Sequence, residues 1–267
     1  MKKYIAFFRL RFSMGLQYRS AALAGMATQF FWGAMEILMF RAFYRADPSA
    51  FPMTLEATCS YVWLQQAFLA LFMAWVMENE IFDSILNGNV AYELCRPVNI
   101  YNMWFSRNIA NRFSKATLRC MPILLLAVLL PAPYGLMTPA GPVALFLFFL
   151  TLLLGVGVTV SFCMLVYMLC FFTLSPMGLR IVAVSTVEFF SGGIIPLPFL
   201  PDGVRKVVEL LPFASMQNVP LRIYSGDLQG NSMLRALLLQ VFWLCALIAA
   251  GKALDTLAMK KITVQGG

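Results

Sequence analysis

Long uncharged stretches of apolar residues constrain this chain more than any other feature. The clearest covers residues 142–172, and a run of about 18 or more apolar residues is long enough to cross a bilayer as a helix. Within it, Gly155, Gly157 and Ser161 supply a small-residue surface for close helix contact. Only 12% of the residues are charged, against about 25% in a soluble domain. So little charge cannot cover a water-facing surface, which excludes a soluble enzyme and a disordered protein.

The chain has room for six membrane-spanning segments, and we expect one all-α, polytopic domain over residues 1–267. The third span ends at the Pro131 to Pro133 turn and begins well before Met121, because the residues between them are too few to cross. The fifth apolar run is short, because Pro196 interrupts the pattern directly after it. The other spans, and this short run, are predicted at residues 21–40, 58–77, 142–172, 181–195 and 233–254.

Residues 1–20 have an amphipathic pattern, which differs from the uniformly apolar spans. At the spacing of an α-helix, one face is polar and holds Lys2, Arg9, Ser13, Gln17 and Ser20. The other face is apolar apart from Arg11 and holds Tyr4, Phe7, Phe8, Phe12, Met14 and Tyr18. This pattern predicts an interfacial helix on the membrane surface. A simpler interpretation is a basic flank that orients the first span, and the two are compatible.

The distribution of positive charge indicates the orientation in the membrane. The formal net charge is +8, but the cations lie beside apolar runs and not on a face interleaved with aromatic residues, which favours anionic lipid over nucleic acid. Most cations fall in segments that a cytoplasmic N-terminus would place inside. The positive-inside rule therefore predicts two cytoplasmic termini. One such segment precedes the third span, and we expect it to hold its cations at the membrane interface, namely Arg96, Arg107, Arg112, Lys115 and Arg119.

The sequence lacks the residue patterns that catalytic and metal sites usually need. Histidine is absent, and the six cysteines form no C-x-x-C pair, so neither a metal site nor a disulfide framework is predicted. No G-x-x-x-x-G-K-[ST] phosphate-binding loop occurs. We therefore expect a chain that is not an enzyme, binds no cofactor and takes its energy from another subunit.

Two stretches carry a resemblance to a known family. Residues 78–107 read ENEIFDSILNGNVAYELCRPVNIYNMWFSR, in which an apolar ridge of Ile81, Phe82, Ile85 and Leu86 lies among acids and precedes Gly88 and a Leu-x-Arg-Pro step. Residues 188–226 read EFFSGGIIPLPFLPDGVRKVVELLPFASMQNVPLRIYSG, in which glycine and proline end an apolar run before a short amphipathic pattern. With the predicted topology, these stretches resemble the membrane subunits of type-2 ATP-binding cassette (ABC) exporters, in particular those that export drugs and toxins.

The resemblance implies a permease subunit without a nucleotide-binding site. A dimer of cytoplasmic ABC ATPases, which uses ATP and Mg, would dock on residues 78–107. A second permease, identical or paralogous, would complete a path for a small amphipathic drug, toxin or antibiotic-like substrate across the bacterial cytoplasmic (inner) membrane. The coupling role would fall on Glu80, Ile81, Asp83, Ile85, Gly88, Glu93, Leu94, Arg96 and Pro97. An outer re-entrant segment at residues 196–228 would close the path, with a gate at Gly192, Gly193, Pro196, Pro198, Pro201 and Pro212.

Plainer interpretations stay open at each of these places. The segment 78–107 is alternatively a solvated loop, and the glycines and prolines alternatively only end helices. Glu36 and Glu188 lie inside apolar runs, where an ionisable group is costly and often functional. Each either binds a cationic substrate in a cavity or pairs with an arginine of a neighbouring helix. The alternative functions are an ion-coupled secondary transporter, an ABC permease for a lipid-linked glycan and a non-transporting membrane scaffold.

Overall fold

The structure of the chain is a computed structural model that describes residues 2–17, 19–48, 51–173 and 176–261. Within these residues every regular element is a helix, which confirms the predicted all-α class. The long helices are α2 (Arg19–Ala46), α3 (Leu55–Phe72), α6 (Ile100–Leu129), α7 (Pro142–Cys170), α8 (Pro176–Phe190) and α11 (Gly230–Lys261). The shorter elements are α1 (Lys2–Gly15), η2 (Ala74–Val76), α4 (Asn79–Leu86), α5 (Val90–Leu94), η3 (Leu197–Phe199), α9 (Asp202–Val208) and α10 (Asn218–Tyr224).

Among the described residues, 4 helical stretches are long and apolar enough to cross a membrane. They are Ala22–Ala46, Leu55–Leu86, Pro142–Cys170 and Gly230–Lys260. The helix α6 begins well before Met121, as predicted, but its first half is charged. The helix α8 has only 15 residues. These two helices stand where the third and fifth spans were expected, so a count of six spans stays a prediction.

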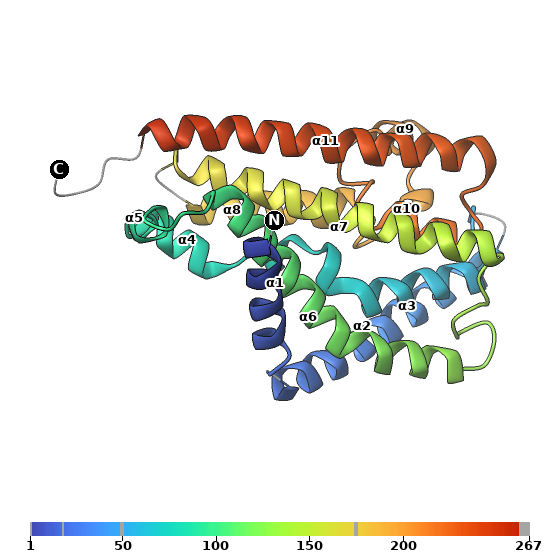
Figure 1. The fold of residues 1–267 in the computed structure, drawn as a ribbon. Helices are drawn as coiled ribbons and strands as arrows, with labels where there is room; N and C mark the ends of the chain where they lie inside the picture. The colour runs from blue at the N-terminus through green and yellow to red at the C-terminus, as the bar shows by residue number, and fades with distance from the viewer. Residues whose placement is uncertain (1, 18, 49–50, 174–175, 262–267) are drawn as a thin grey trace.

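The long helices run side by side in two groups (Figure 1). In one group α7 packs along α11, and in the other α2, α3 and α6 pack against one another. The helices α4 and α5 lie at one end of the molecule, which we call the α5 end, and the last turns of α11 reach the same end. The helices α9 and α10 lie toward the opposite end, which we call the α9 end.

The N-terminal helix α1 crosses the direction of α7 and α11 (Figure 1) and packs against α6. Tyr4 and Phe7 of its apolar face pack against the core, and Lys2 and Arg9 are exposed, so the amphipathic pattern is confirmed at these positions. Met14 of the predicted apolar face is exposed, and a position on the membrane surface stays a prediction. At Gly15 the two helices approach so closely that an added Cβ would lie 2.1 Å from the Ser114 hydroxyl oxygen. The predicted residue Tyr18 and the side chain of Ser20 lie outside the described part.

Small residues on α7 permit the close packing that the sequence predicts. An added Cβ at Gly155 would lie 2.1 Å from the carbonyl oxygen of Met216, and one at Gly157 would lie 2.9 Å from a methyl carbon of Leu244 on α11. Ser161 is fully buried, and its hydroxyl donates to the carbonyl of Gly157 at 2.7 Å. The prediction is therefore confirmed at both glycines, because a larger residue would meet the Met216 backbone at Gly155 and the Leu244 side chain at Gly157.

Two cations of α6 are buried among protein groups and do not reach the surface, while their expected depth at the membrane interface stays a prediction. Arg112 is fully buried and Arg107 is 5% exposed. The Arg112 guanidinium donates to the carbonyl oxygens of Leu71 and Met73 at 3.0 and 2.9 Å, where α3 ends. The last carbonyls of a helix have no partner in their own helix and carry partial negative charge, which compensates the buried cation.

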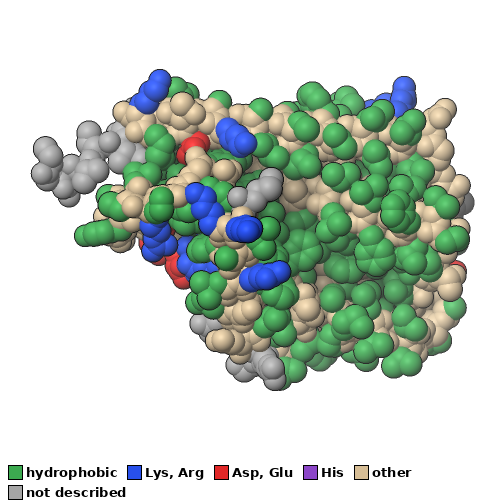
Figure 2. All heavy atoms as spheres, in the orientation of Figure 1, with side chains coloured by type: hydrophobic (Ala, Val, Ile, Leu, Met, Phe, Trp, Pro, Cys, Tyr) green, Lys and Arg blue, Asp and Glu red, His purple; other side chains and the backbone are tan. Residues whose placement is uncertain are grey.

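Apolar side chains cover most of the face seen in Figure 2, and the lysines and arginines gather toward the α5 end. The helices α2 and α11 expose most of their apolar residues. In the most apolar 18-residue stretch of each helix, only 22% and 11% of the residues are buried. Among the large exposed side chains are Phe31, Trp32, Leu234, Leu238 and Phe242. Such a surface is stable against lipid or another apolar partner and not in water, and the protein is therefore a multi-pass membrane protein.

The segment between α8 and α11 folds into short helices. The helix α10 packs against α7, and its Leu221 and Ile223 are buried. The adjacent Tyr224 hydroxyl donates to the carbonyl of Met137 at 2.9 Å, which ties this segment to the connection between α6 and α7. The segment thus packs into the bundle near the α9 end (Figure 1), while a re-entrant path through the membrane stays a prediction.

The close approach at Gly155 gives a direct test of this packing. We expect Gly155→Ala to lower the free energy of unfolding by about 1–3 kcal/mol, because the new methyl group meets backbone that cannot rotate away. Thermal unfolding of the detergent-purified protein measures the loss. The matched control is Gly203→Ala, where an added Cβ meets nothing within 4 Å. Equal midpoints for the two variants would contradict the packing of α7.

Candidate functional site

The predicted coupling segment begins at the point where α3 stops. The chain passes from Phe72 through η2 into α4, and Gly88 follows α4 with a φ of +71°. This left-handed conformation favours glycine. The helix α5 ends before Pro97, and α6 begins at Ile100. Both predicted breaks, at Gly88 and Pro97, are confirmed.

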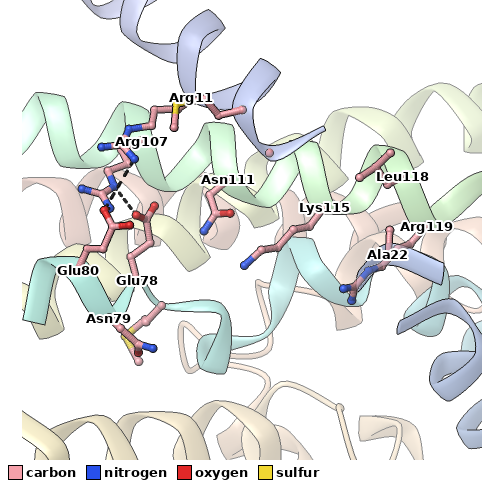
Figure 3. A pocket seen from close by; sticks show the side chains of 13 residues that line it. Arg11, Ala22, Glu78, Asn79, Glu80, Arg107, Asn111, Lys115, Leu118 and Arg119 are labelled. Atoms are coloured by element: carbon pink, nitrogen blue, oxygen red, sulfur yellow. Dashed lines mark hydrogen bonds and ion pairs between the residues drawn. The ribbon is translucent and has the colours of Figure 1, made fainter. Parts of the chain in front are cut away.

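A cluster of ion pairs fixes the start of α4 against α6 (Figure 3). Arg107 donates through Nε to the carboxylate of Glu78 and through Nη2 to that of Glu80. Arg11 of α1 lies 3.8 Å from Glu80, measured from Nη1 to Oε2. The Glu78 side chain is 10% exposed and that of Glu80 is 71% exposed. The pair of Arg107 with Glu78 is therefore largely withdrawn from solvent, whereas Glu80 reaches outward.

The same face of α6 lines a cavity of about 540 Å³ with a polar stripe. Arg107, Asn111, Lys115 and Arg119 lie at intervals of four residues, and such residues share one face of a helix. Figure 3 shows them beside the first turns of α2 and the turn that leads into α4. The stripe leads from the ion-pair cluster into the bundle.

A second network connects this junction to α7. The Tyr167 hydroxyl accepts a hydrogen bond from the backbone N–H of Glu78 at 2.7 Å and one from the Asn108 amide at 3.1 Å. The side-chain oxygen Oδ1 of Asn108 accepts a hydrogen bond from Nε of Arg112 at 2.9 Å. Because Tyr167, Asn108 and Arg112 are all buried, every member is held by the others in a medium where hydrogen bonds are strong.

The helix α8 is attached to the same junction. Arg180, in its second turn, donates to the side-chain oxygen of Asn79 at 2.5 Å and to the carbonyl of Trp75 at 3.5 Å. Its guanidinium also lies 5.6 Å from the ring centroid of Phe82, within the range of a cation–π contact. The junction between α3 and α4 therefore contacts α6, α7 and α8.

At its other end, α8 is tied to α3 through the predicted gate glycines. The Tyr61 hydroxyl donates to the carbonyl of Gly192 at 3.2 Å, and the Gln65 amide donates to that of Gly193 at 2.6 Å. Gly192 has a φ of +82°, and an added Cβ would lie 2.6 Å from the Tyr61 oxygen. Irregular backbone within a membrane protein needs such internal partners, and here α3 provides them.

The predicted gate prolines follow the glycine turn toward the α9 end. Pro196 and Pro198 flank the start of η3 and are buried, as is Pro212, whereas Pro201 is exposed and precedes α9. Each proline therefore lies beside a helix end or turn, which fits both gating and plain helix termination.

A second cavity, of about 670 Å³, lies between α2, α3 and the end of α8. Glu36 and Glu188, the two acids predicted inside apolar runs, both line it. Glu36 accepts a hydrogen bond from the Gln66 amide at 3.2 Å. The lining is mainly apolar and includes Trp32 and Trp75. The structure thus brings together two carboxylates that the sequence holds far apart.

Comparison with known protein families shows which family this chain belongs to. The family described as ABC-2 family transporter protein matches residues 30–266, which is nearly the whole chain. The chain belongs to the ABC-2 transporter family. Members of this family are transmembrane permease subunits, distinct from the nucleotide-binding subunit, and generally work with a cytoplasmic ATPase. Comparisons with curated proteins and with solved structures found no match.

The apolar ridge of this ABC-2 permease faces inward, which revises its expected role in docking. Ile81 is fully buried and Phe82 is 6% exposed, and both belong to the core of this chain. Ile85 is half-buried and packs against the same core. In this conformation Ile81 cannot touch an ATPase. The apolar side chains that the segment leaves exposed are Leu86, Tyr92 and Leu94.

We call the exposed part of the segment, with Leu86, Tyr92 and Leu94, its tip. The other predicted coupling residues come from the same segment. Asp83, Gly88 and Arg96 are exposed. Glu93 is half-buried and accepts a hydrogen bond from the Trp104 indole at 2.5 Å. The carbonyl of Pro97 accepts from the Lys3 ammonium at 2.6 Å, which ties the end of the segment to α1.

Sequence reasoning missed several polar residues that build these sites. Gln29, Gln65 and Gln66 line the second cavity, and Asn108 and Tyr167 complete the buried network. The signal that would have found the glutamines is an amide inside an apolar run, where polar groups face protein or a cavity more often than lipid. No comparable signal marks Tyr167, because a tyrosine is common in apolar helices.

The ion-pair cluster yields a prediction for stability. We expect Arg107→Gln to lower the free energy of unfolding by about 3 kcal/mol, because it leaves the Glu78 carboxylate buried without its partner. The control Glu80→Gln removes the exposed partner and should cost less than about 1 kcal/mol. Thermal unfolding in detergent compares the two. If both variants lose the same amount, the buried pair does not hold the junction.

Proposed function

We propose that this ABC-2 permease is the membrane subunit of an ATP-driven exporter and that a separate ABC ATPase dimer docks at the α5 end. The observation that carries the proposal is the set of ties around the α3–α4 junction. Glu78, Asn79 and Glu80 contact α6, α7 and α8 through Arg107, Tyr167 and Arg180. Packed elements joined in this way transmit rigid-body movement. ATP and Mg are used by the partner, because this chain lacks a phosphate-binding loop.

The exposed tip of the segment supplies the docking surface. Leu86 is 57% exposed and Tyr92 is 77% exposed, beside the charged residues Asp83 and Arg96. A few apolar and aromatic anchors surrounded by polar residues are typical of the energetic centre of a protein interface. The buried side of α4 then faces the bundle, so a push on the tip reaches the core through Ile81.

The helix α8 connects the docking region with the opposite end. Arg180 fixes its first half to the α3–α4 junction, and Gly192 and Gly193, just beyond its last turn, are held by α3. A tilt of α8 that follows closure of the ATPase would strain these last two bonds. We infer that Gly192 and Gly193, with the prolines after them, open and close the outer side of the path.

The cavity between α2, α3 and α8 is the proposed position of the substrate. Its apolar lining and aromatic rings suit a small amphipathic or hydrophobic drug, toxin or antibiotic-like compound. The exposed apolar residues of α2, among them Phe31 and Met35, favour a second permease, identical or paralogous, that closes this face. In this arrangement α6 and α8 complete six spans, and both termini are cytoplasmic, as the distribution of cations predicts. The membrane is the bacterial inner membrane, as the resemblance to type-2 ABC exporters implies.

One observation favours a second candidate function, an ion-coupled secondary transporter. Glu36 and Glu188 line the same cavity between α2, α3 and α8, and carboxylates inside membrane segments carry protons or cations in many transporters. Transport by vesicles that hold a proton gradient but no ATP separates the two functions. Transport that needs ATP supports the exporter, and transport that persists without ATP supports the alternative.

The docking surface gives the test of the proposed function. We expect the double variant Leu86→Ser and Tyr92→Ser to reduce recovery of the ATPase at least tenfold when the tagged permease is purified from its native membrane, because two apolar anchors are lost. Quantitative mass spectrometry of the co-purified proteins measures the recovery.

The matched control changes Val128 and Leu129 to serine, because both are exposed, at 64% and 79%, and lie at the far end of α6. This control should retain the ATPase, and gel filtration should show an unchanged permease in both cases. Full recovery of the ATPase by the variant of the tip would remove the assignment of the docking surface.

A further inference from the structure

The cavity between α2, α3 and α8 has an unusual distribution of charge for a largely apolar site. Glu36 comes from α2 and Glu188 from α8, and both line the same volume of about 670 Å³. Among the described residues, the ion pairs of this chain join other partners, and none of them includes Glu36 or Glu188. Of the two alternatives that the sequence left open for these acids, pairing with an arginine of a neighbouring helix is therefore not seen among the described residues.

Two neighbouring glutamines of α3 contact the parts of α2 and of the turn after α8 that lie beside Glu36 and Glu188. Gln66 donates to the carboxylate of Glu36 at 3.2 Å, and Gln65 donates to the carbonyl of Gly193 at 2.6 Å. Gly193 follows Glu188 by just over one helical turn, and the two residues approach each other, because an added Cβ at Gly193 would lie 3.2 Å from the Glu188 carbonyl oxygen. The turn after α8 and the middle of α2 are thus both tied to one step of α3.

The guanidinium of Arg119 also lines the cavity, but it does so at the other end. Its central carbon lies close to Gly25, because an added Cβ there would come within 2.6 Å of it. Gly25 and Glu36 are separated by roughly 16 Å along α2 at 1.5 Å per residue. Arg119 also lines the cavity of Figure 3, so it stands where the two cavities meet. The carboxylates therefore dominate the part near Gln65 and Gln66.

A buried polar side chain without a partner provides an independent indication of a ligand. Gln29 is 4% exposed and lines the cavity, and neither its amide nitrogen nor its carbonyl oxygen has a hydrogen-bond partner. A buried amide without partners is costly. Buried polar groups in native structures normally have a hydrogen-bond partner. A bound molecule with a polar group would give the Gln29 amide such a partner.

We propose that this cavity binds organic cations, in which an ammonium or phosphonium group is attached to an apolar body. Glu36 and Glu188 neutralise the charge, the rings of Trp32 and Trp75 and the side chain of Leu69 surround the apolar part, and the Gln29 amide bonds to a polar substituent. Aromatic faces also attract cations directly. This inference rests on the proposed function, because it names the substrate class of the same cavity.

The test compares two probes that share size and shape but differ in the sign of the charge. Saturable binding of tetraphenylphosphonium and of tetraphenylborate is measured on the purified full-length protein in detergent. We expect the cation to bind at least tenfold more tightly than the anion. The double variant Glu36→Gln and Glu188→Gln should bind the cation at least tenfold more weakly. It should no longer prefer the cation over the anion.

Two further variants separate charge from folding. Glu36→Asp with Glu188→Asp keeps both carboxylates and should keep the preference for the cation. Glu56→Gln removes an exposed acid outside the cavity and should leave binding unchanged. Equal affinity for the two probes, or undiminished cation binding by the double glutamine variant, overturns the proposal. Because these measurements need no ATPase, cation binding without ATP-driven transport would overturn the proposed function and leave the cation site standing.

Discussion

The buried guanidinium of Arg112 is the interaction on which the rest of the structure depends. A membrane helix that stops inside a bundle leaves carbonyl groups that water cannot reach, and each must find an internal partner. Arg112 meets those of Ala70, Leu71 and Met73 and is itself held by Asn108 and by the sulfur of Cys163. This arrangement allows α3 to end at Phe72. The chain can then turn into α4 while the end of α3 stays within the protein.

The turn made possible by Arg112 converts a connection between helices into a mechanical junction. The backbone of Glu78 is bonded to Tyr167 of α7, its carboxylate to Arg107 of α6, and the next residue to Arg180 of α8. Few of these partners are free to reorient in the packed interior. The start of α4 is therefore bonded to three helices, one of which, α8, also lines the cavity between α2 and α3 at Glu188.

Four polar residues of the apolar helices α2 and α3 share one position. The side chains of Gln29, Glu36, Gln65 and Gln66 lie on α2 and α3, and all of them line the cavity that α8 completes. By contrast, exposed positions on α2 such as Phe31 and Met35 are apolar. Polar groups are expensive against lipid, so their collection on one surface distinguishes the cavity side of these helices from the exposed apolar side.

The sequence by itself determined the membrane class, the long helix that spans 142–170, the amphipathic α1 and the breaks at Gly88, Pro97 and Gly192. These features depend on local rules, namely apolar length, helical periodicity and the backbone freedom of glycine and proline. Only the tertiary structure decided which side of α4 faces inward, that Arg107 and Arg112 are buried, and that Glu36 and Glu188 share a cavity. Periodicity reveals that a face is apolar but not what covers it, so Ile81 was expected to meet a partner and instead packs in the core. Likewise, the charge of an arginine gives no indication of burial until the carbonyls and carboxylates that compensate it are brought near by the fold.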